Sequence, residues 1–228
     1  MKEFQTNEIR NIALIGGAKS GKTTLADVIL GLLRPRSGEF VIDGTSITDD
    51  NIHAWQRSVG YVQQDIFLSD ASILENIAFG IAKADIDRER ALAAARGARL
   101  DDFVLTTLPS GYETLVGERG VRLSGGQRQR IGIARALYND VDLIVFDEAT
   151  SALDNVTEKQ VMESVDTLPG SKTVILIAHR LSTLDKCDRL IVMDRGRTVG
   201  IGTKHDLQET NAHFKKLVSA ALRDSTTK

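Results

Sequence analysis

A glycine-rich segment near the start of the chain has the residue types and spacing of a phosphate-binding loop. Gly16 is followed after four residues by Gly21, Lys22 and Thr23, and an apolar run, Asn11–Ile15, precedes it. Between a strand and a helix, such a loop wraps the β-phosphate with backbone N–H groups, while the lysine reaches the β- and γ-phosphates and the threonine holds Mg²⁺. We therefore predict a nucleotide site made by Gly16, Gly17, Ala18, Lys19, Ser20, Gly21, Lys22, Thr23 and Thr24.

A second apolar run, Leu143–Phe146, ends in two acidic residues, Asp147 and Glu148. A buried parallel strand places Asp147 at the carboxyl edge of a sheet, beside the phosphate-binding loop, where it could bind Mg²⁺. Glu148 would then face the attacking water as a general base or a water-positioning group. The alternative is a solvated acidic pair that ends a strand, which is less expected downstream of a phosphate-binding loop.

A third segment, Leu123–Gln127, has a serine and two glycines at the predicted start of a helix. Ser124 is a preferred N-cap, and Gly125 and Gly126 leave backbone N–H groups uncovered at the positive end of the helix dipole. This arrangement favours an anion. The alternative is an ordinary glycine-containing loop, which is disfavoured because nucleotide-handling motifs flank the segment.

Together, these motifs in this order resemble the ATP-binding-cassette (ABC) ATPase domain, whose signature motif is LSGGQ. The resemblance implies ATP and Mg²⁺ as ligands, with Ser124, Gly125, Gly126 and Gln127 contacting the nucleotide across a head-to-tail homodimer. It also implies that Gln64 contacts Mg²⁺ and water, that His179 is the switch histidine, and that a D-loop links the two sites. The residues of that D-loop would be Ser151, Ala152, Leu153 and Asp154. Taken alone, a loop glutamine carries no such meaning, and a histidine at a strand end is more often structural.

Two further segments resemble ABC exporters in particular. Gly117–Gly120 is similar to the exporter X-loop, and Leu68–Gly80 is similar to the exporter segment after the loop that contains Gln64. They favour an exporter or flippase over an importer, with a transmembrane domain as partner. The expected location is the cytoplasm, or the cytoplasmic face of a membrane through that partner.

The N-terminus departs from the ABC pattern. Only fifteen residues precede Gly16, Phe4 is the one aromatic residue among them, and Lys19 stands where the family usually has glycine. Residues 1–28 instead resemble the opening of a translational GTPase of the elongation-factor-G type, which suggests a chimera; a truncated or divergent ABC domain is the alternative. A GTPase over the whole chain is disfavoured because the guanine-reading Asn-Lys-x-Asp motif is absent.

Composition excludes several other classes. The 228 residues are 42% apolar and carry a formal charge of −2, so nucleic acid is not expected as a partner. The single cysteine, Cys187, excludes an intrachain disulfide and is expected to be a small, at least half-buried side chain. Three histidines lack metal-ligand spacing and are expected at the surface: His53, His205 and His213. No apolar run approaches the roughly 20 residues that span a bilayer, and no signal peptide is expected.

The hydrophobic pattern alternates strands with helices, which predicts an α/β fold with a mainly parallel sheet covered on both faces. With the resemblance, this is a P-loop NTPase of the RecA-like ABC type. We expect one domain, with an α/β core over residues 1–70 and 138–228 and an inserted helical subdomain over 71–137. Residues 212–222 predict a final amphipathic helix, with fraying expected after it.

Three functions are consistent with this sequence. The first is an ATPase that energises an exporter or flippase through a separate transmembrane domain. The second is an engineered or chimeric P-loop domain that folds and binds nucleotide without productive turnover. The third is an ABC protein that acts on DNA or ribosomes, which the X-loop-like segment and the near-neutral charge disfavour.

Overall fold

The computed structural model describes residues 11–226 apart from residue 18, residues 118–122, 148–162, 164–171 and 179–180. It divides into two compact units, which we describe separately. Unit 1 comprises Met1–Val59, Leu143–Glu148 and Gly170–Lys228, and unit 2 comprises Gly60–Asp142 and Ala149–Pro169.

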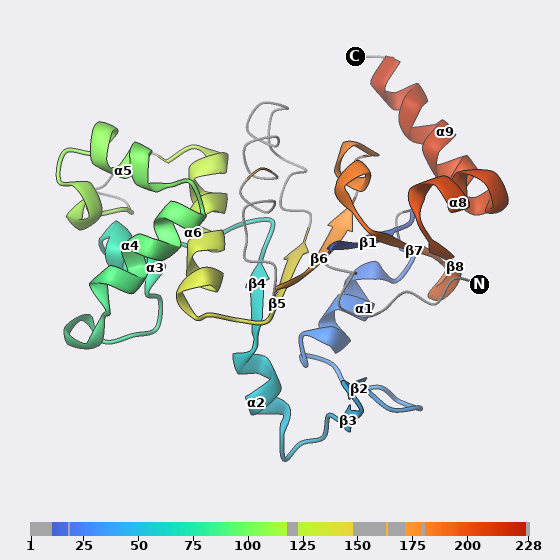
Figure 1. The fold of residues 1–228 in the computed structure, drawn as a ribbon, viewed down its shortest axis with the longest axis horizontal. Coiled ribbons are helices and arrows are strands. Elements are labelled where there is room, and N and C mark those ends of the chain that lie inside the picture. The colour runs from blue at the N-terminus through green and yellow to red at the C-terminus, as the bar shows by residue number, and fades with distance from the viewer. Residues whose placement is uncertain are drawn as a thin grey trace. The chain divides into compact units, whose positions relative to one another are not determined.

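The sheet of unit 1 is built around its first strand. Along the sheet the strands lie in the order β5, β6, β1, β7, β8 (Figure 1). β1 pairs in parallel with both β6 and β7, β5 pairs in parallel with β6, and only β8 is antiparallel to its neighbour β7. The bounds are β1 (Asn11–Ile15), β5 (Leu143–Asp147), β6 (Thr173–Ala178), β7 (Arg189–Asp194) and β8 (Arg197–Gly202). These strands are mostly continuous apolar runs because parallel strands are buried on both faces.

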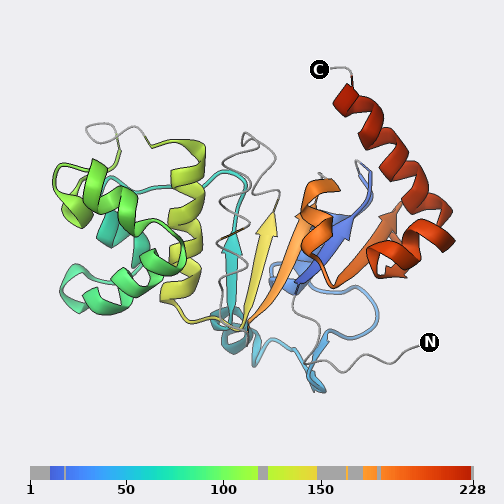
Figure 2. The same cartoon turned by 45° about the horizontal axis from the view of Figure 1, so that its top comes forward.

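Helices and a small hairpin complete unit 1. α1 contacts β6, α8 contacts β8, and α9 contacts β7. The C-terminal helix α9, in dark red, can be followed in Figure 2. The elements are α1 (Lys22–Ile29), β2 (Val41–Ile42), β3 (Thr45–Ser46), α2 (Ile52–Arg57), the 3-10 helix η4 (Leu181–Lys186), α8 (Lys204–Thr210) and α9 (Ala212–Thr226). Trp55 on α2 donates its indole N–H to the carbonyl of Ile29 at 2.6 Å and meets Phe40 edge to face, which fastens α2 to the end of α1.

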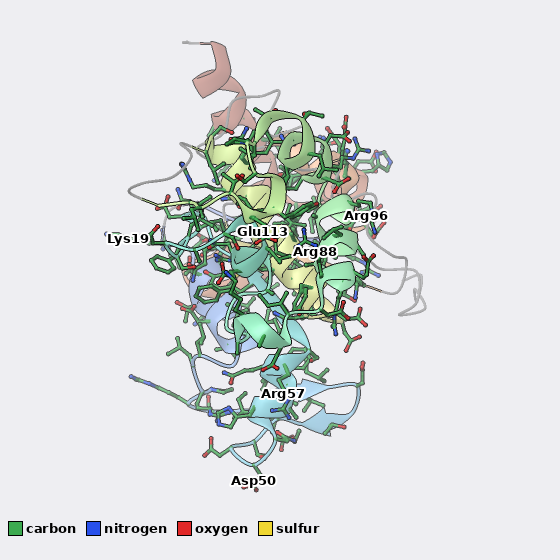
Figure 3. All side chains as sticks on the ribbon, turned by 90° about the vertical axis from the view of Figure 1, so that its left-hand side faces the viewer. Lys19, Asp50, Arg57, Arg88, Arg96 and Glu113 are labelled. Atoms are coloured by element: carbon green, nitrogen blue, oxygen red, sulfur yellow. The ribbon has the colours of Figure 1, made fainter. Side chains whose placement is uncertain are left out.

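Unit 2 is mainly helical. It contains most of β4 (Val59–Val62) together with α3 (Ile73–Ile77), η2 (Lys83–Asp85), α4 (Arg88–Gly97), α5 (Asp101–Thr107), η3 (Gly111–Glu113) and α6 (Gly125–Tyr138). Its core is apolar and completely buried at Ile73, Ile77, Val104, Ile131 and Ile133. At the surface, Arg88 of α4 forms a 2.5 Å salt bridge with Glu113 of η3 (Figure 3).

The predicted α/β class with a mainly parallel sheet is confirmed. The apolar runs Asn11–Ile15 and Leu143–Phe146 form strands as predicted, and the second strand extends by one residue, to Asp147. The expected fraying after residue 222 is wrong, because α9 continues to Thr226. The sequence analysis predicted neither β8 nor α2, whereas α5 lies within the stretch predicted to be helical.

Candidate nucleotide-binding site

The phosphate-binding loop of unit 1 joins the end of β1 to the start of α1. Gly21 is the N-cap of α1 and has a left-handed backbone, with φ 95°. Lys19 is also left-handed, with φ 59°. Among the described residues the N-cap, being glycine, provides no side-chain hydrogen bond to the helix start, and Thr23 on the first turn is exposed. A helix start without a capping side chain, after a loop that turns repeatedly through left-handed residues, offers backbone N–H groups to an anion.

Lys22 folds back over this loop. Its ammonium group donates to the carbonyl of Gly16 at 2.8 Å and to that of Gly17 at 3.2 Å, and lies 3.4 Å from the hydroxyl of Ser20. The side chain is buried, as is Ser20. The ammonium group of Lys22 is therefore held among the atoms that would surround a phosphate.

The loop packs tightly against the turn between β7 and β8. The N–H of Gly196 in that turn donates to the carbonyl of Ser20 at 2.9 Å. A Cβ on Gly21 would lie 3.1 Å from the Cα of Gly196, and a Cβ on Gly16 would lie 2.4 Å from the carbonyl oxygen of Met193. The glycines therefore allow a close approach that fixes the path of the loop.

Asp147 lies at the same edge of the sheet as the loop. It ends β5 and pairs in register with Ile177, while Ile15, the last residue of β1, pairs with the next residue along β6, Ala178. One strand separates β5 from β1, so the backbones of Asp147 and Ile15 are about 10 Å apart at a spacing of 4.7–4.9 Å per strand. The carboxylate and the phosphate-binding loop thus share one edge of unit 1, as the sequence predicts.

The signature segment lies in unit 2, at the start of α6. Ser124 caps the helix: its hydroxyl oxygen accepts from the N–H of Gln127 at 3.2 Å, and its own N–H donates to Oε1 of Gln127 at 2.7 Å. The predicted N-cap is confirmed. Ser124 is exposed, and this cap uses its oxygen as an acceptor, so the hydroxyl hydrogen can still be given to a ligand.

Gln64 lies in the loop that follows β4, in unit 2, with an exposed side chain. The two exporter-like segments meet in the same unit. The N–H of Val116 donates to the carbonyl of Ala71 at 2.9 Å. A Cβ on Gly117, whose φ is 127°, would lie 2.6 Å from the carboxylate of Asp70.

Several predicted site residues lie outside the described residues: Ala18, Glu148, the D-loop residues Ser151, Ala152, Leu153 and Asp154, and His179. Of the other residues singled out from the sequence, His53, His205 and His213 are exposed, as expected. Cys187 is half-buried and donates to the carbonyl of Thr183, and burial raises the pKa of its thiol to about 12. The cysteine is therefore an unreactive packing residue.

Comparison with known protein families shows to which family this chain belongs. Residues 2–151 match the ABC transporter family. The chain belongs to the ABC transporter family. The match includes the phosphate-binding loop and begins ahead of β1, so nothing supports the suggestion that residues 1–28 come from a translational GTPase.

Individual ABC proteins are similar over most of the chain. It is 42% identical to the ATP-dependent lipid A-core flippase of Alkalilimnicola ehrlichii, covering 90% of this chain and 35% of that protein. It is also 42% identical to the beta-(1→2)glucan export ATP-binding/permease protein NdvA of Rhizobium meliloti, covering 96% of this chain and 37% of that protein. The ATP-bound structure of a bacterial Atm1-family ABC exporter matches with a TM-score of 0.82 and 37% identity, over 92% of this chain and 37% of that one.

The chain spans only about a third of the length of these ABC relatives, at 35% and 37% of the two proteins above. None of the helices described in unit 1 or unit 2 is long and apolar enough to cross a membrane. The ABC resemblance inferred from the sequence is thus confirmed at the level of the family, including its exporter and flippase members.

One buried residue of the signature helix was missed from the sequence. Gln129 on α6 is 4% exposed and donates from Nε2 to the carbonyls of Gln63 and Gln64 at 3.1 and 2.7 Å. A polar residue in a helix is normally read as exposed. The available indication was the small residues on the same face, Gly132 and Ala136, which mark a close approach of another backbone to this side of the helix.

Proposed function

We propose that this chain is the ATP-hydrolysing domain of an ABC exporter or flippase. The observation that carries the proposal is the phosphate-binding loop with its buried lysine at the carboxyl edge of the sheet, with Asp147 one strand away on the same edge. In open α/β sheets this edge is where nucleotides bind. The family match and the names of the relatives, which include flippase and export proteins, agree with it.

The described residues fit a nucleotide triphosphate. The uncapped first turn of α1 offers backbone N–H groups, and Lys22 can exchange the carbonyls of Gly16 and Gly17 for phosphate oxygens without leaving the loop. Phosphate oxygens are the stronger acceptors because they are charged. ATP is the nucleotide expected from the family.

The donor set also fits Mg²⁺, which prefers oxygen ligands and is bound in nucleotide sites by one or two protein groups plus phosphate. We propose Thr23, Asp147 and Gln64 as its protein contacts. When bound, Mg²⁺ neutralises the charge that builds up on the phosphate oxygens. Glu148 would orient and deprotonate the attacking water, and His179 would contact the γ-phosphate.

A second subunit would complete each site. In this proposal two copies associate head to tail, and the Ser124–Gln127 segment of one copy faces the nucleotide bound by the other. The cap of α6 supports this role, since Ser124 holds the helix start while keeping a hydroxyl hydrogen to donate. The D-loop residues Ser151, Ala152, Leu153 and Asp154 would connect the two sites.

The transmembrane partner would contact unit 2 near the exporter-like segments. Phe67 and Phe79 are 66% and 48% exposed and pack edge to face with 6.3 Å between ring centroids. Contiguous exposed apolar surface is a feature of protein–protein interaction sites. The Arg135 guanidinium of α6 lies 4.6 Å over the Phe79 ring and also donates to the Asn76 carbonyl at 2.7 Å. We assign this surface to the membrane domain because the export ATP-binding/permease protein NdvA is more than twice as long as this chain. The domain would then lie at the cytoplasmic face of the membrane.

An ATPase assay with and without Mg²⁺ tests the function. We expect Mg²⁺-dependent turnover in the wild type and, in Glu148→Gln, retained ATP binding with turnover about 10²–10⁴-fold lower, since general-base catalysis contributes that much. The same variant should form an ATP-dependent dimer, measurable by size-exclusion chromatography. A folded wild type that binds ATP but does not turn it over, with or without added Mg²⁺, would contradict the proposal.

A further inference from the structure

The face of α6 that meets the Gln64 loop is formed by three residues at helical spacing, Gln129, Gly132 and Ala136. A Cβ on Gly132 would lie 2.7 Å from Cδ1 of Ile66, two residues after Gln64, and a Cβ on Gly60 would lie 2.7 Å from Cβ of Ala136. The two glycines thus let β4 and the loop after it lie directly against the helix. The loop is therefore attached to α6 along its length, within unit 2.

Gln129 provides the polar contact in this attachment. Its Nε2 carries two hydrogens and donates them to the carbonyls of Gln63 and Gln64, at 3.1 and 2.7 Å. These carbonyls belong to the two peptide groups on either side of the Gln64 Cα. Because peptide groups are planar, holding both of them fixes φ and ψ of Gln64 and so the direction of its Cα–Cβ bond. The Gln64 side chain itself remains exposed.

We infer that Gln129 is a positioning residue, which aims Gln64 at the nucleotide-bound Mg²⁺ and makes the Gln64 backbone move together with the signature helix. The inference rests on the proposed function, because it uses Gln64 as a contact of Mg²⁺. Gln129 lies five residues after Ser124 on the same helix, about 7.5 Å along its axis at 1.5 Å per residue. A shift of the helix start is thereby transmitted to the backbone of Gln64 through one side chain.

The variant Gln129→Met tests whether Gln129 positions Gln64 without preventing the protein from folding. Gln129→Met keeps the length and approximate volume but removes both donors. It also removes Oε1, which is buried and has no hydrogen-bond partner among the described residues. The carbonyls that lose their donor belong to Gln63 and Gln64, which are exposed residues, so water can replace the amide as their donor. We therefore expect Gln129→Met to fold with a thermal midpoint close to that of the wild type.

The test measures binding of the non-hydrolysable analogue AMP-PNP by calorimetry, with EDTA and with Mg²⁺. In EDTA, we expect the affinity of Gln129→Met for AMP-PNP to lie within about twofold of the wild type. The factor by which Mg²⁺ increases this affinity should be about tenfold smaller than in the wild type, as is found when outer-shell partners of metal sites are mutated. Gln64→Ala should show the same pattern. In the double variant the second change should add less than about twofold, because both residues act through one contact.

Tyr138→Phe is the matched control. Tyr138 lies on the same helix, is buried, and accepts one hydrogen bond from the N–H of Asp87 at 3.1 Å, at the other end of α6. It should leave the Mg²⁺ effect unchanged. If Gln129→Met fails to fold, Gln129→Asn, which keeps the amide but is one methylene too short to reach both carbonyls, is measured in the same way.

Additive losses in the double variant, or equal losses with EDTA and with Mg²⁺, would overturn the positioning role while leaving the proposed function intact. An unchanged Mg²⁺ effect in Gln64→Ala would overturn the assignment of Gln64 and this inference together. An absence of any Mg²⁺ effect in the wild type would contradict the proposed function itself.

Discussion

Gly16 lies so close to Met193 that a Cβ atom on the glycine would sit 2.4 Å from the methionine's carbonyl oxygen. The same Cβ would lie 2.5 Å from the hydroxyl oxygen of Ser20, whereas a Cβ on the neighbouring Gly17 would meet nothing within 4 Å. Two adjacent glycines of one loop therefore have different roles. The first permits contact between the loop and β7, and the second faces open space.

This difference predicts opposite results for the two alanine variants. Gly16→Ala should destabilise unit 1 by about 1–3 kcal/mol, because overpacking against a backbone atom forces the loop to shift. Gly17→Ala should change the free energy of unfolding by less than about 0.5 kcal/mol, as surface substitutions do. Urea unfolding followed by circular dichroism measures both, and equal stabilities would contradict the packing described for the loop.

The backbone conformation of Lys19 predicts that replacing this residue with glycine stabilises the protein. Its φ of 59° is left-handed, a conformation that costs a residue with a Cβ about 1–2 kcal/mol. The ABC family usually has glycine at this position, and the backbone conformation explains why. Lys19→Gly should therefore raise the free energy of unfolding by roughly 0.5–1 kcal/mol, after subtracting the greater unfolded-state entropy of glycine. Lys19→Ala removes the charge but keeps the strain, so it should give no such gain in the same urea titration.

Ser124 caps α6 and, in the proposed function, also contacts the nucleotide of the other subunit. Replacing it with aspartate tests these two roles separately. Asp caps helices about as well as Ser, so Ser124→Asp should unfold within about 0.5 kcal/mol of the wild type, whereas Ser124→Ala should cost about 1 kcal/mol. The aspartate carboxylate would repel the phosphates of the other subunit. We expect Ser124→Asp to bind ATP as a monomer but to lose ATP-dependent dimerisation, measured by light scattering. Dimerisation at wild-type ATP concentrations would remove Ser124 from the proposed intersubunit contact.

Glu75 is expected to contribute to the loss of folding stability at low pH. It accepts hydrogen bonds from the hydroxyl and the N–H of Ser72 at 2.6 and 3.1 Å, and these bonds lower the pKa of its carboxyl group. A lowered folded-state pKa contributes stability that is complete above the ordinary glutamate pKa of about 4.3 and is lost as the pH falls through the folded value.

Glu75→Gln keeps a capping side chain but cannot titrate. Its urea midpoint should therefore fall less steeply than that of the wild type between pH 5 and pH 3. Some slope should remain, because Asp206 caps α8 in the same way and hydrogen bonds from Thr203 lower the pKa of its carboxyl group too. Parallel curves for the two proteins would show that Glu75 carries none of the acid sensitivity.

Base recognition gives a further prediction. Phosphate binding by backbone N–H groups and Lys22 does not distinguish adenine from guanine, and Phe4, the one aromatic residue ahead of Gly16, lies outside the described residues. Base stacking is worth roughly 1–3 kcal/mol in nucleic-acid platforms. We expect Mg-ATP and Mg-GTP to compete with affinities within about tenfold, or about 1.4 kcal/mol. A larger preference that Phe4→Ala abolishes would identify Phe4 as the base-reading group.

The parts of the fold that the sequence predicts are those with a strong local pattern. β1, β5 and β6 are continuous apolar runs, and α6 begins at a serine with glutamine three residues later, which is a capping box. β8 has no such pattern. It contains Gly200, where a Cβ would lie 2.3 Å from Nδ2 of Asn211, so the strand has a glycine because another segment approaches it closely.

The candidate site likewise contains residues that a local sequence pattern predicts and one residue that it does not. The residues of the phosphate-binding loop, Asp147 and Ser124 were predicted because each lies at the end of a recognisable strand or the start of a helix. Gly132 and Ala136 indicate that another segment approaches the face of α6 that carries Gln129. The partner itself could not be predicted, because it is the backbone of Gln63 and Gln64, more than sixty residues earlier. A contact with backbone carbonyls places no requirement on the side chains of its partners, so the sequence carries no paired pattern to find.

The contacts of Lys22 within its own loop bear on how the domain empties after each cycle. The ammonium group already has acceptors in the carbonyls of Gly16 and Gly17, so in the proposed function an arriving phosphate would replace them and a departing one would give them back. The buried charge is never left without a partner at the moment of product release, when an unpaired ammonium would be costly. If the loop binds the nucleotide as proposed, these internal acceptors would compete with the phosphate for Lys22 and so would ease the release of product.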